Sequence, residues 1–175
     1  MCHLKKIFFI SIFILVFSGI VNAQISGQLF QQESEIPGVK IYFKNSDKKS
    51  ESDFHGFFKL QIPEGIGKDD LILKDRELYV EILNLEFGFE KLNLGKIELP
   101  TFKSISIEEY EQLSESEKES CYPIKHWTNL IGYLYTNKLE HEYLILNCKN
   151  KITEFEYNPS TKTVSVDWNL IKHCE

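Results

Sequence analysis

The stretch IPGVKIYFKNSDKKSESDFHGFFKLQIPEG, residues 36–65, decides the fold that the sequence predicts. Apolar and polar residues alternate in VKIYF (39–43) and again in FFKLQIP (57–63). Alternation with a period of two is typical of strands that bury one face. Between the two runs, DFHG (53–56) marks a tight turn, because Gly56 tolerates positive φ and Asp53 can accept nearby backbone N–H groups. The stretch therefore predicts two strands joined by structured turns.

The same periodicity extends outward over residues 24–100. QISGQLF (24–30) precedes the stretch, and further short alternating runs follow it as far as Pro100. Turn signals punctuate these runs at Pro37, Gly38, Gly88 and Gly95. About seven short strands with such punctuation are typical of a sandwich. We expect a mainly β fold whose first part is a seven-stranded antiparallel sandwich.

The composition changes in residues 101–125, which we interpret as an acidic helical linker. Six glutamates and one lysine fall between positions 108 and 119. Ser106 with Glu109 has the spacing of a capping box, and Ser114 with Glu117 repeats it, so the pattern predicts a short acidic helix with a restart at Ser114. A charge run of this kind is usually a solvated face, and an acidic binding surface is the alternative.

Residues 126–175 predict a second β region. HWTNLIGYLYTN (126–137) fits a short helix or a strand, whereas EYLILNC (142–148), ITEFEYN (152–158) and TVSVDWNLI (163–171) fit strands. Short loops would place Tyr157 opposite Val164, and Phe155 opposite both Val166 and Leu144. The apolar face of this three-stranded β-meander would collect Leu144, Leu146, Phe155, Tyr157, Val164, Val166 and Trp168. It needs cover, either from the acidic helix through Tyr110 and Leu113 or from the first sandwich.

The first 23 residues have the pattern of a signal peptide. Lys5 and Lys6 precede an apolar run at 7–17, and small residues lead to Ala23. We expect cleavage before Gln24. The alternative, an uncleaved membrane anchor, is disfavoured because the run is shorter than the ~20 residues of a spanning helix. A lipoprotein needs a cysteine just after the run, but the next one is Cys121, so lipidation is not expected and the protein is predicted to be exported.

The net charge restricts the partners. The chain carries a formal charge of −6, and the signal segment holds two lysines and no acid, so the remainder carries −8. Nucleic-acid binding needs lysine and arginine to displace counterions, and anionic membranes attract basic segments. We therefore expect neither a nucleic-acid nor a membrane-surface partner, and no membrane span after cleavage.

Four elements in order resemble the carboxypeptidase regulatory-like domain, a transthyretin-like β-sandwich common in exported proteins of Gram-negative bacteria. They are Ile25-Ser26-Gly27, Pro37-Gly38-Val39, the Asp53-Phe54-His55-Gly56-Phe57-Phe58 hairpin and Gly88-Phe89. The resemblance covers residues 24–100 and implies an accessory module without an active site. In that family the module accompanies metallocarboxypeptidases or outer-membrane receptors. The remaining residues, about 75 in number, are too few for either attached domain.

Motifs for catalysis are missing from the sequence. EHEYLI (140–145) begins like a zincin helix, but Ile145 stands where the second histidine must be. There is no Gly-x-Ser-x-Gly elbow and no phosphate-binding loop. A Cys–His nucleophile would have to come from Cys121 with His126 or Cys148 with His173. We expect no catalytic, cofactor-binding or metal-binding residues.

Three cysteines remain beyond the signal segment: Cys121, Cys148 and Cys174. An exported chain meets an oxidising compartment, which permits a disulfide. A Cys148–Cys174 bridge would close a loop of about 25 residues and stabilise the tail by roughly 3 kcal/mol. Cys121 bonded to either of them is the alternative pairing.

These observations predict a non-catalytic interaction or accessory module of the cell envelope, whose partner is an envelope protein or peptide. Strand addition at an exposed sheet edge is the expected mode. One alternative is a carbohydrate or peptidoglycan binder that uses exposed aromatic side chains such as Trp127 or Trp168. The other is a thiol-dependent hydrolase that uses Cys121 or Cys148.

Overall fold

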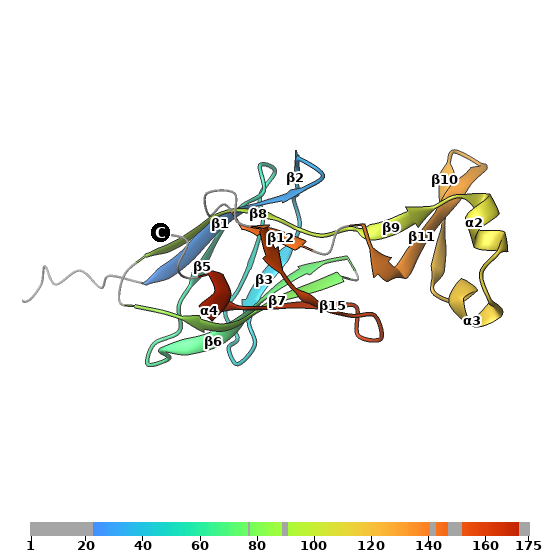
Figure 1. The fold of residues 1–175 in the computed structure, drawn as a ribbon. Helices are drawn as coiled ribbons and strands as arrows, with labels where there is room; N and C mark the ends of the chain where they lie inside the picture. Colours follow the sequence, from blue (N-terminus) through green and yellow to red (C-terminus); the bar gives the residue numbers. More distant parts are fainter. Residues whose placement is uncertain (1–22, 77, 89–90, 141–142, 147–151, 172–175) are drawn as a thin grey trace, which may run out of the picture.

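The computed structural model describes residues 23–171 except 77, 89–90, 141–142 and 147–151. It is mainly β, as the sequence predicts, and its sheets are open rather than closed into a barrel. Figure 1 shows two parts, a β-sandwich and a smaller unit that projects from one end of it. We call the smaller part the projecting unit; it is formed by residues 102–139.

Two mixed sheets form the sandwich. The first sheet has the order β13 (Ile152–Glu154), β12 (Tyr143–Leu146), β8 (Leu92–Glu98), β1 (Gln24–Gln31) and β2 (Ser34–Glu35), with β5 (Phe57–Gln61) also paired to β1. The second has the order β14 (Glu156–Asn158), β15 (Thr163–Asp167), β7 (Leu78–Glu86), β6 (Lys68–Asp75), β3 (Lys40–Phe43) and β4 (Lys49–Glu51). The sandwich is not wholly antiparallel, because β1 pairs with β8 and β15 with β7 in parallel.

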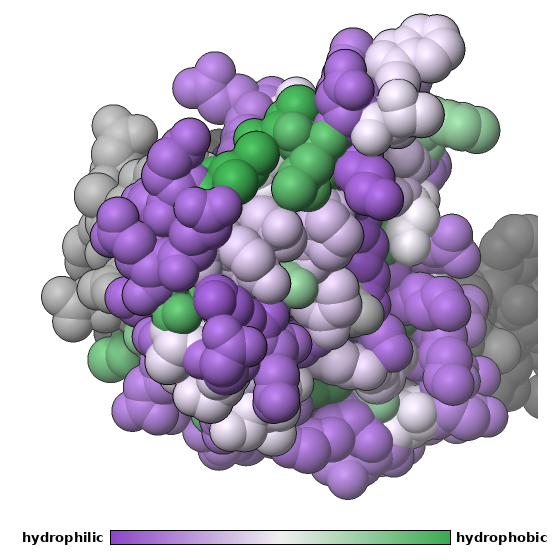
Figure 2. All heavy atoms as spheres, turned by 90° about the vertical axis from the view of Figure 1, so that its right-hand side faces the viewer, coloured by the Kyte–Doolittle hydropathy of each residue, from purple (hydrophilic) through white to green (hydrophobic). Residues whose placement is uncertain are grey.

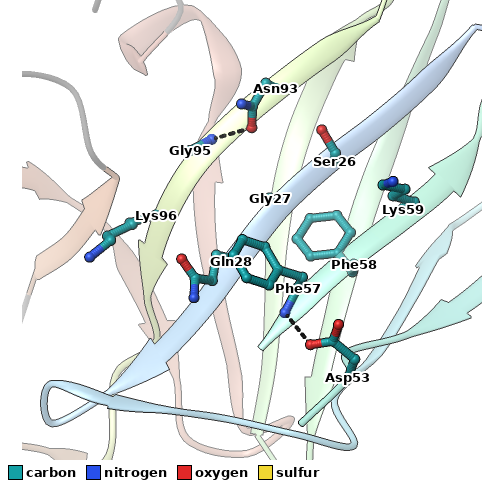
Figure 3. A pocket seen from close by; sticks show the side chains of 10 residues that line it. All are labelled: Ser26, Gly27, Gln28, Asp53, Phe57, Phe58, Lys59, Asn93, Gly95 and Lys96. Carbon is teal, nitrogen blue, oxygen red and sulfur yellow. Dashed lines mark hydrogen bonds between the residues drawn. The ribbon is translucent and has the colours of Figure 1, made fainter. Parts of the chain in front are cut away.

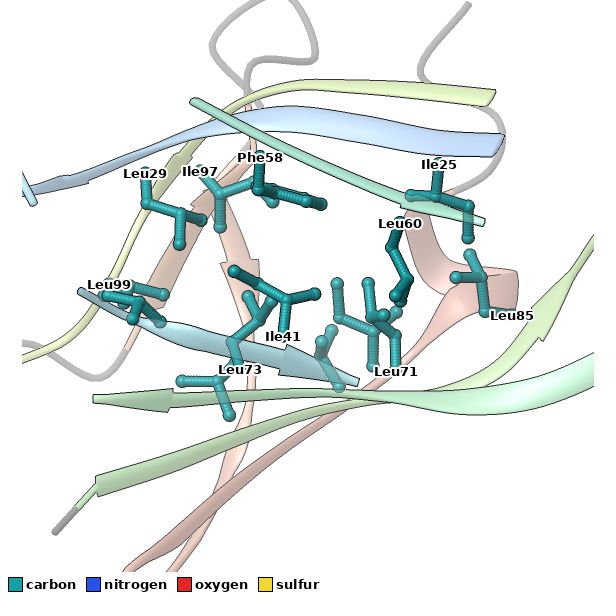
Figure 4. Close-up of a cluster of buried hydrophobic side chains, with 14 of the residues drawn as sticks. Ile25, Leu29, Ile41, Phe58, Leu60, Leu71, Leu73, Leu85, Ile97 and Leu99 are labelled. Atoms are coloured by element: carbon teal, nitrogen blue, oxygen red, sulfur yellow. The ribbon is translucent and has the colours of Figure 1, made fainter. Parts of the chain in front are cut away.

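The core lies between these two sheets, where the predicted alternation buries one face of each strand. β1 has the burial pattern expected of a half-buried strand, with Ile25 and Leu29 fully buried. Figure 4 shows Leu29 directed toward Ile41 and Leu73 of the opposite sheet, and Ile25 directed toward Leu85. Burying each such aliphatic side chain stabilises the fold by about 1.5–3 kcal/mol.

The projecting unit contains a three-stranded antiparallel sheet and two short helices. Its sheet has the order β10 (Cys121–His126), β11 (Asn129–Leu139) and β9 (Phe102–Ile105). The helices α2 (Ile107–Glu111) and α3 (Glu115–Lys118) begin at the two predicted capping boxes, at Ser106 and Ser114. The stretch 126–137, which fitted a helix or a strand, belongs mostly to β11. Both ends of the predicted linker 101–125 also form strands.

The C-terminal strands do not form the single three-stranded meander that the sequence predicted. β12 and β13 extend the first sheet, whereas β14 and β15 extend the second, so the chain changes sheets between Glu154 and Glu156. The registry of Tyr157 opposite Val164 is confirmed, but Leu144 pairs with Thr153 rather than Phe155. Period-two alternation specifies which face is buried, not which neighbour provides the hydrogen bonds. The short helix α4 (Trp168–Ile171) follows β15.

Candidate interaction surface on the first sheet

The predicted turn at residues 53–56 is built around one carboxylate. The Oδ1 atom of Asp53 accepts hydrogen bonds from the backbone N–H groups of His55 and Phe57, both at 2.9 Å. Gly56 has a φ of +72°, and its N–H donates to the Asp53 carbonyl at 2.9 Å. A Cβ at this position would collide with the carbonyl oxygen of Leu29. Aspartate and glycine are therefore structural here, as the sequence predicted.

The other predicted turn residues lie in connections, in line with their expected roles. Pro37 and Gly38 separate β2 from β3, and Gly38 has a φ of +79°. Buried Ser52 fixes this connection, because its hydroxyl accepts from Val39 N–H at 2.9 Å and donates to the Ile36 carbonyl at 2.8 Å. Gly88 lies in the connection after β7.

Gly95, by contrast, does not form a turn between strands. It lies within β8, where the pairing with β1 shifts register between Ser26 and Gln28. Its φ is +67°, and its N–H donates to the side-chain oxygen of Asn93 at 3.0 Å. The glycine marks a β-bulge rather than a chain reversal.

The turn begins β5, which is an edge strand of the first sheet. Ile62 N–H donates to Ala23 C=O, and Leu29 N–H donates to Gly56 C=O, both at 2.9 Å. In an antiparallel ladder, residue pairs alternate between hydrogen-bonded and non-hydrogen-bonded. Lys59 and Gln61 belong to non-hydrogen-bonded pairs with β1, so their backbone N–H and C=O groups face away from it. No described residue forms a hydrogen bond with those groups. We call this row the β5 edge.

The β10 edge of the projecting unit differs in this respect. Thr136 N–H donates to Ser120 C=O at 2.9 Å, and by the same alternation Pro123 lies at a position that faces away from β11. Proline has no N–H, so this edge lacks a donor where an added strand would need one. A proline in an edge strand is a common protection against unwanted pairing.

An open hollow of about 590 Å³ lies on the outer face of the first sheet beside the β5 edge. Its lining comes from β1, β5, β8 and the turn, as Figure 3 shows: Ser26, Gly27, Gln28, Asp53, Phe57, Phe58, Lys59, Asn93, Gly95 and Lys96. The two lysines are the only cations among these residues, and Asp53 the only acid. The carboxylate is already used by the turn, so the hollow offers two positive charges beside the exposed ring of Phe57 and the buried ring of Phe58.

Two exposed aromatic rings lie at the turn and at the start of β5, and the second of them lines the hollow. Phe54 at the turn is 90% exposed, and Phe57 at the start of β5 is 51% exposed. Polar contacts hold the turn against β1 and the neighbouring hairpin, because Gln28 Nε2 donates to the His55 carbonyl at 2.9 Å and His55 Nδ1 lies 3.2 Å from Glu35 Oε2. The rings are thus presented on a fixed scaffold. Sequence analysis identified the turn but not the exposure of its rings, which alternation alone does not show.

The tryptophans have opposite environments. Trp168, expected in a buried face, is partly buried against the sandwich core. Trp127 is 89% exposed in the turn between β10 and β11 and has a φ of +58°. Ile131 on β11 is 59% exposed. Figure 2 views the molecule from the end that carries the projecting unit. It shows apolar side chains gathered near the top of a mainly hydrophilic face.

Among the described residues, the predicted nucleophile Cys121 and its predicted base His126 do not lie together. Cys121 and His126 lie at opposite ends of β10, paired with Tyr135 and Asn129 respectively. Burial raises the pKa of the free Cys121 thiol, and the Glu117 carboxylate raises it further. A raised pKa keeps the thiol protonated and unreactive at neutral pH. Cys148, His173 and Cys174, including the proposed Cys148–Cys174 disulfide, lie outside the described residues.

Metal-ligand clusters and membrane-spanning helices are both absent from the described residues. No group of three or more His, Cys, Asp or Glu side chains in that part of the chain could hold a metal ion. None of its helices has the length and apolar character needed to cross a bilayer.

Comparison with known proteins leaves the chain without an assigned family. No protein-family model and no curated protein matches it. Two similar solved structures are N-terminal and C-terminal interface mutants of a type II cohesin–X-dockerin complex from Acetivibrio cellulolyticus, at 17% and 15% identity with TM-scores of 0.37 and 0.36. Each match covers 42% of this chain and 52% of the other, about half its length. Similarity at this level carries no inference about activity or partner.

Proposed function

We propose that this chain is an exported, non-catalytic interaction module that binds an extended peptide segment of an envelope protein along the β5 edge. The observation that carries the proposal is the row of outward backbone groups at Lys59 and Gln61, which no described residue satisfies. An added strand would pair with these groups and extend the first sheet.

The surroundings of the β5 edge favour a specific segment over unspecific pairing. Exposed Phe54 and Phe57 offer apolar area for side chains on alternate positions of an added strand. Lys59 and Lys96, which line the neighbouring hollow, favour acidic side chains in the bound segment. A peptide that alternates acidic and apolar residues fits this chemistry.

Export and the resemblance to the carboxypeptidase regulatory-like domain are part of the same proposal. The signal pattern at residues 1–23 supports an envelope or extracellular location. Three of the four elements behind the resemblance lie in β1, the Pro37-Gly38 connection and the turn before β5, and these adjoin the proposed surface. A module of this kind acts by binding.

The experiment compares two substitutions of one edge residue. Lys59→Pro removes an outward N–H without breaking a bond to β1, whereas Lys59→Ala removes the same side chain and keeps the N–H. Both variants and the wild type are used to capture proteins from envelope extracts. We expect partners held by Lys59→Ala and lost by Lys59→Pro.

Hydrogen exchange makes the test specific to the edge. In the free protein the amides of Lys59 and Gln61 should exchange rapidly while those of Phe58 and Leu60 are protected. A captured partner should slow exchange at Lys59 and Gln61. Equal capture by both Lys59 variants, or an unchanged exchange pattern in the complex, would contradict strand addition.

Carbohydrate binding is a second candidate, favoured by the exposure of Trp127. A bulky residue with positive φ is unusual, and its ring lies almost wholly in solvent, where it can stack on a sugar face. Sedimentation with purified peptidoglycan tests it, with Trp127→Ala compared with the adjacent control Thr128→Ala. Loss of co-sedimentation confined to Trp127→Ala supports this candidate, and equal co-sedimentation of both variants removes it.

A further inference from the structure

A second cavity, of about 410 Å³, lies where the projecting unit meets the sandwich. We call it the junction pocket. The turn between β6 and β7 forms one wall with Asp75, Arg76 and Leu78, and β9 and β11 form the other with Phe102 and Leu134. It is separate from the β5 edge and plays no part in the proposed function.

The junction pocket contains the chain's single arginine, Arg76. The guanidinium lies next to Asp75 in sequence, yet no described carboxylate lies within 4 Å of it. Asp75 is half-buried, and burial raises the pKa of its carboxyl above the ordinary value, whereas the charge of Arg76 lowers it. Among the described lining residues, Asp75 is the one acid and Arg76 the one base.

The rest of the lining is uncharged: apolar and hydroxyl-bearing side chains, with the amides of Gln31 and Gln32. Leu78, Phe102 and Leu134 supply apolar area, and Thr101, Ser104 and Thr136 supply hydroxyl groups. A pocket with one acid, one base and an apolar wall matches a ligand that is zwitterionic at one end and apolar at the other. Most small-molecule sites combine apolar walls with a few polar groups in this way.

Contacts across the junction hold its walls in place. The Tyr157 hydroxyl donates to the Thr136 carbonyl, and Lys162 Nζ donates to the Tyr122 hydroxyl at 3.2 Å. On the sandwich side, Gln31 Nε2 donates to the Pro100 carbonyl at 3.3 Å. A pocket whose walls are already positioned loses less entropy when it binds a ligand.

We propose that the junction pocket binds a free apolar α-amino acid, with the carboxylate on Arg76, the ammonium on Asp75 and the side chain against Phe102 and Leu134. Each charge-assisted contact requires its own group on the ligand, so blocking either group separates this proposal from simple apolar binding. Peptides carry the two charges further apart and should not satisfy both partners.

Isothermal titration of the whole protein with four ligands tests the proposal: leucine, N-acetyl-leucine, leucinamide and tri-leucine. Leucine should bind, and each of the other three should bind at least about tenfold more weakly. Arg76→Gln should abolish the preference for leucine over leucinamide, and Asp75→Asn the preference over N-acetyl-leucine. Lys48→Gln, in the exposed connection between β3 and β4, is the control and should leave all four affinities unchanged.

Several results would overturn the proposal. These are absence of leucine binding to the wild type, equal binding of leucine and its blocked forms, tri-leucine binding more tightly than leucine, and preferences that survive both pocket substitutions. Circular dichroism establishes that the variants are folded. None of these results affects the β5 edge, which is tested by Lys59→Pro, so failure of one proposal is distinguishable from failure of the other.

Discussion

The sandwich and the projecting unit are built from similar alternating strands, yet they are stabilised differently. In the sandwich two sheets face one another, and side chains such as Phe43 and Ile82 become fully buried. In residues 101–140, all of which the structure describes, the buried side chains are those of Ile105, Tyr135 and Thr136. A sheet without an opposing layer must rely on capping, stacking and its hydrogen-bond ladder. Alternation therefore produces a buried core only where a second layer covers the apolar face.

The largest expected effect comes from removing a core aromatic side chain of the sandwich. Phe43→Ala should lower the free energy of unfolding by about 3–5 kcal/mol, because it leaves a cavity between the sheets. Phe54→Ala removes the same ring from a site that is 90% exposed and should change stability by less than about 0.5 kcal/mol. Urea denaturation measures both. Similar losses in the two variants would contradict the assignment of the core.

The next effect tests the turn between β4 and β5, which connects the two sheets of the sandwich. Gly56→Ala should destabilise by roughly 2 kcal/mol or more, because the new Cβ meets the Leu29 carbonyl in addition to the cost of positive φ. Gly65→Ala has a similar φ, +76°, and open space around it, so its loss should be about 1 kcal/mol. Thermal or urea unfolding compares the pair. Equal losses would show that close contact at Gly56 is unimportant.

A smaller effect is expected from the ring stack that supports the projecting unit. The rings of Tyr110 and Tyr133 are stacked, with centroids 3.7 Å apart and an angle of 10° between their planes. Tyr133→Leu should weaken this unit by about 0.5–1.5 kcal/mol. Hydrogen exchange should accelerate in β9 and β11 and stay unchanged in β6 and β7. The double variant with Tyr110→Leu should cost less than the sum of the single changes, and strict additivity would disprove the coupling.

The smallest effect concerns pH and the start of α3. The Ser114 hydroxyl donates to Glu117 Oε2 at 2.6 Å and the Ser114 N–H donates at 3.0 Å, and these bonds lower the pKa of the Glu117 carboxyl. A lowered pKa in the folded state means that this contribution is fully present above the ordinary value of 4.5 and is lost as pH falls below it. Exchange in α3 should therefore accelerate below that pH. Ser114→Ala should weaken this dependence, and an identical pH profile would contradict the capping role.

Local sequence signals predicted the local features of the molecule well. The turn at Asp53 and Gly56, the capping boxes at Ser106 and Ser114 and the buried alternation of β1 depend on residues close in the chain. Backbone geometry and short-range hydrogen bonding determine such features, so composition and spacing are sufficient. The opposition of Tyr157 and Val164 was also predictable, because a four-residue loop sets that register.

Features that depend on distant partners were not predictable in this way. The tail strands divide between the two sheets, because β12 pairs with β8 and β15 pairs with β7. The alternation of apolar and polar residues does not specify which of these strands each one joins. The junction pocket unites residues from the β6–β7 turn with residues from β9 and β11. No spacing rule relates these segments. Likewise, the exposure of Phe54 and Trp127 follows from the absence of a covering layer.

The order of the residues is enough to predict a mainly β chain, the positions of its tight turns and helix caps, and the apolar face of each early strand. Strand neighbours, the open edge and the cavity that an acid shares with the single arginine depend on the folded chain as a whole. Dihedral preferences and capping act over a few residues, whereas sheet pairing and burial depend on segments brought together from distant parts of the chain.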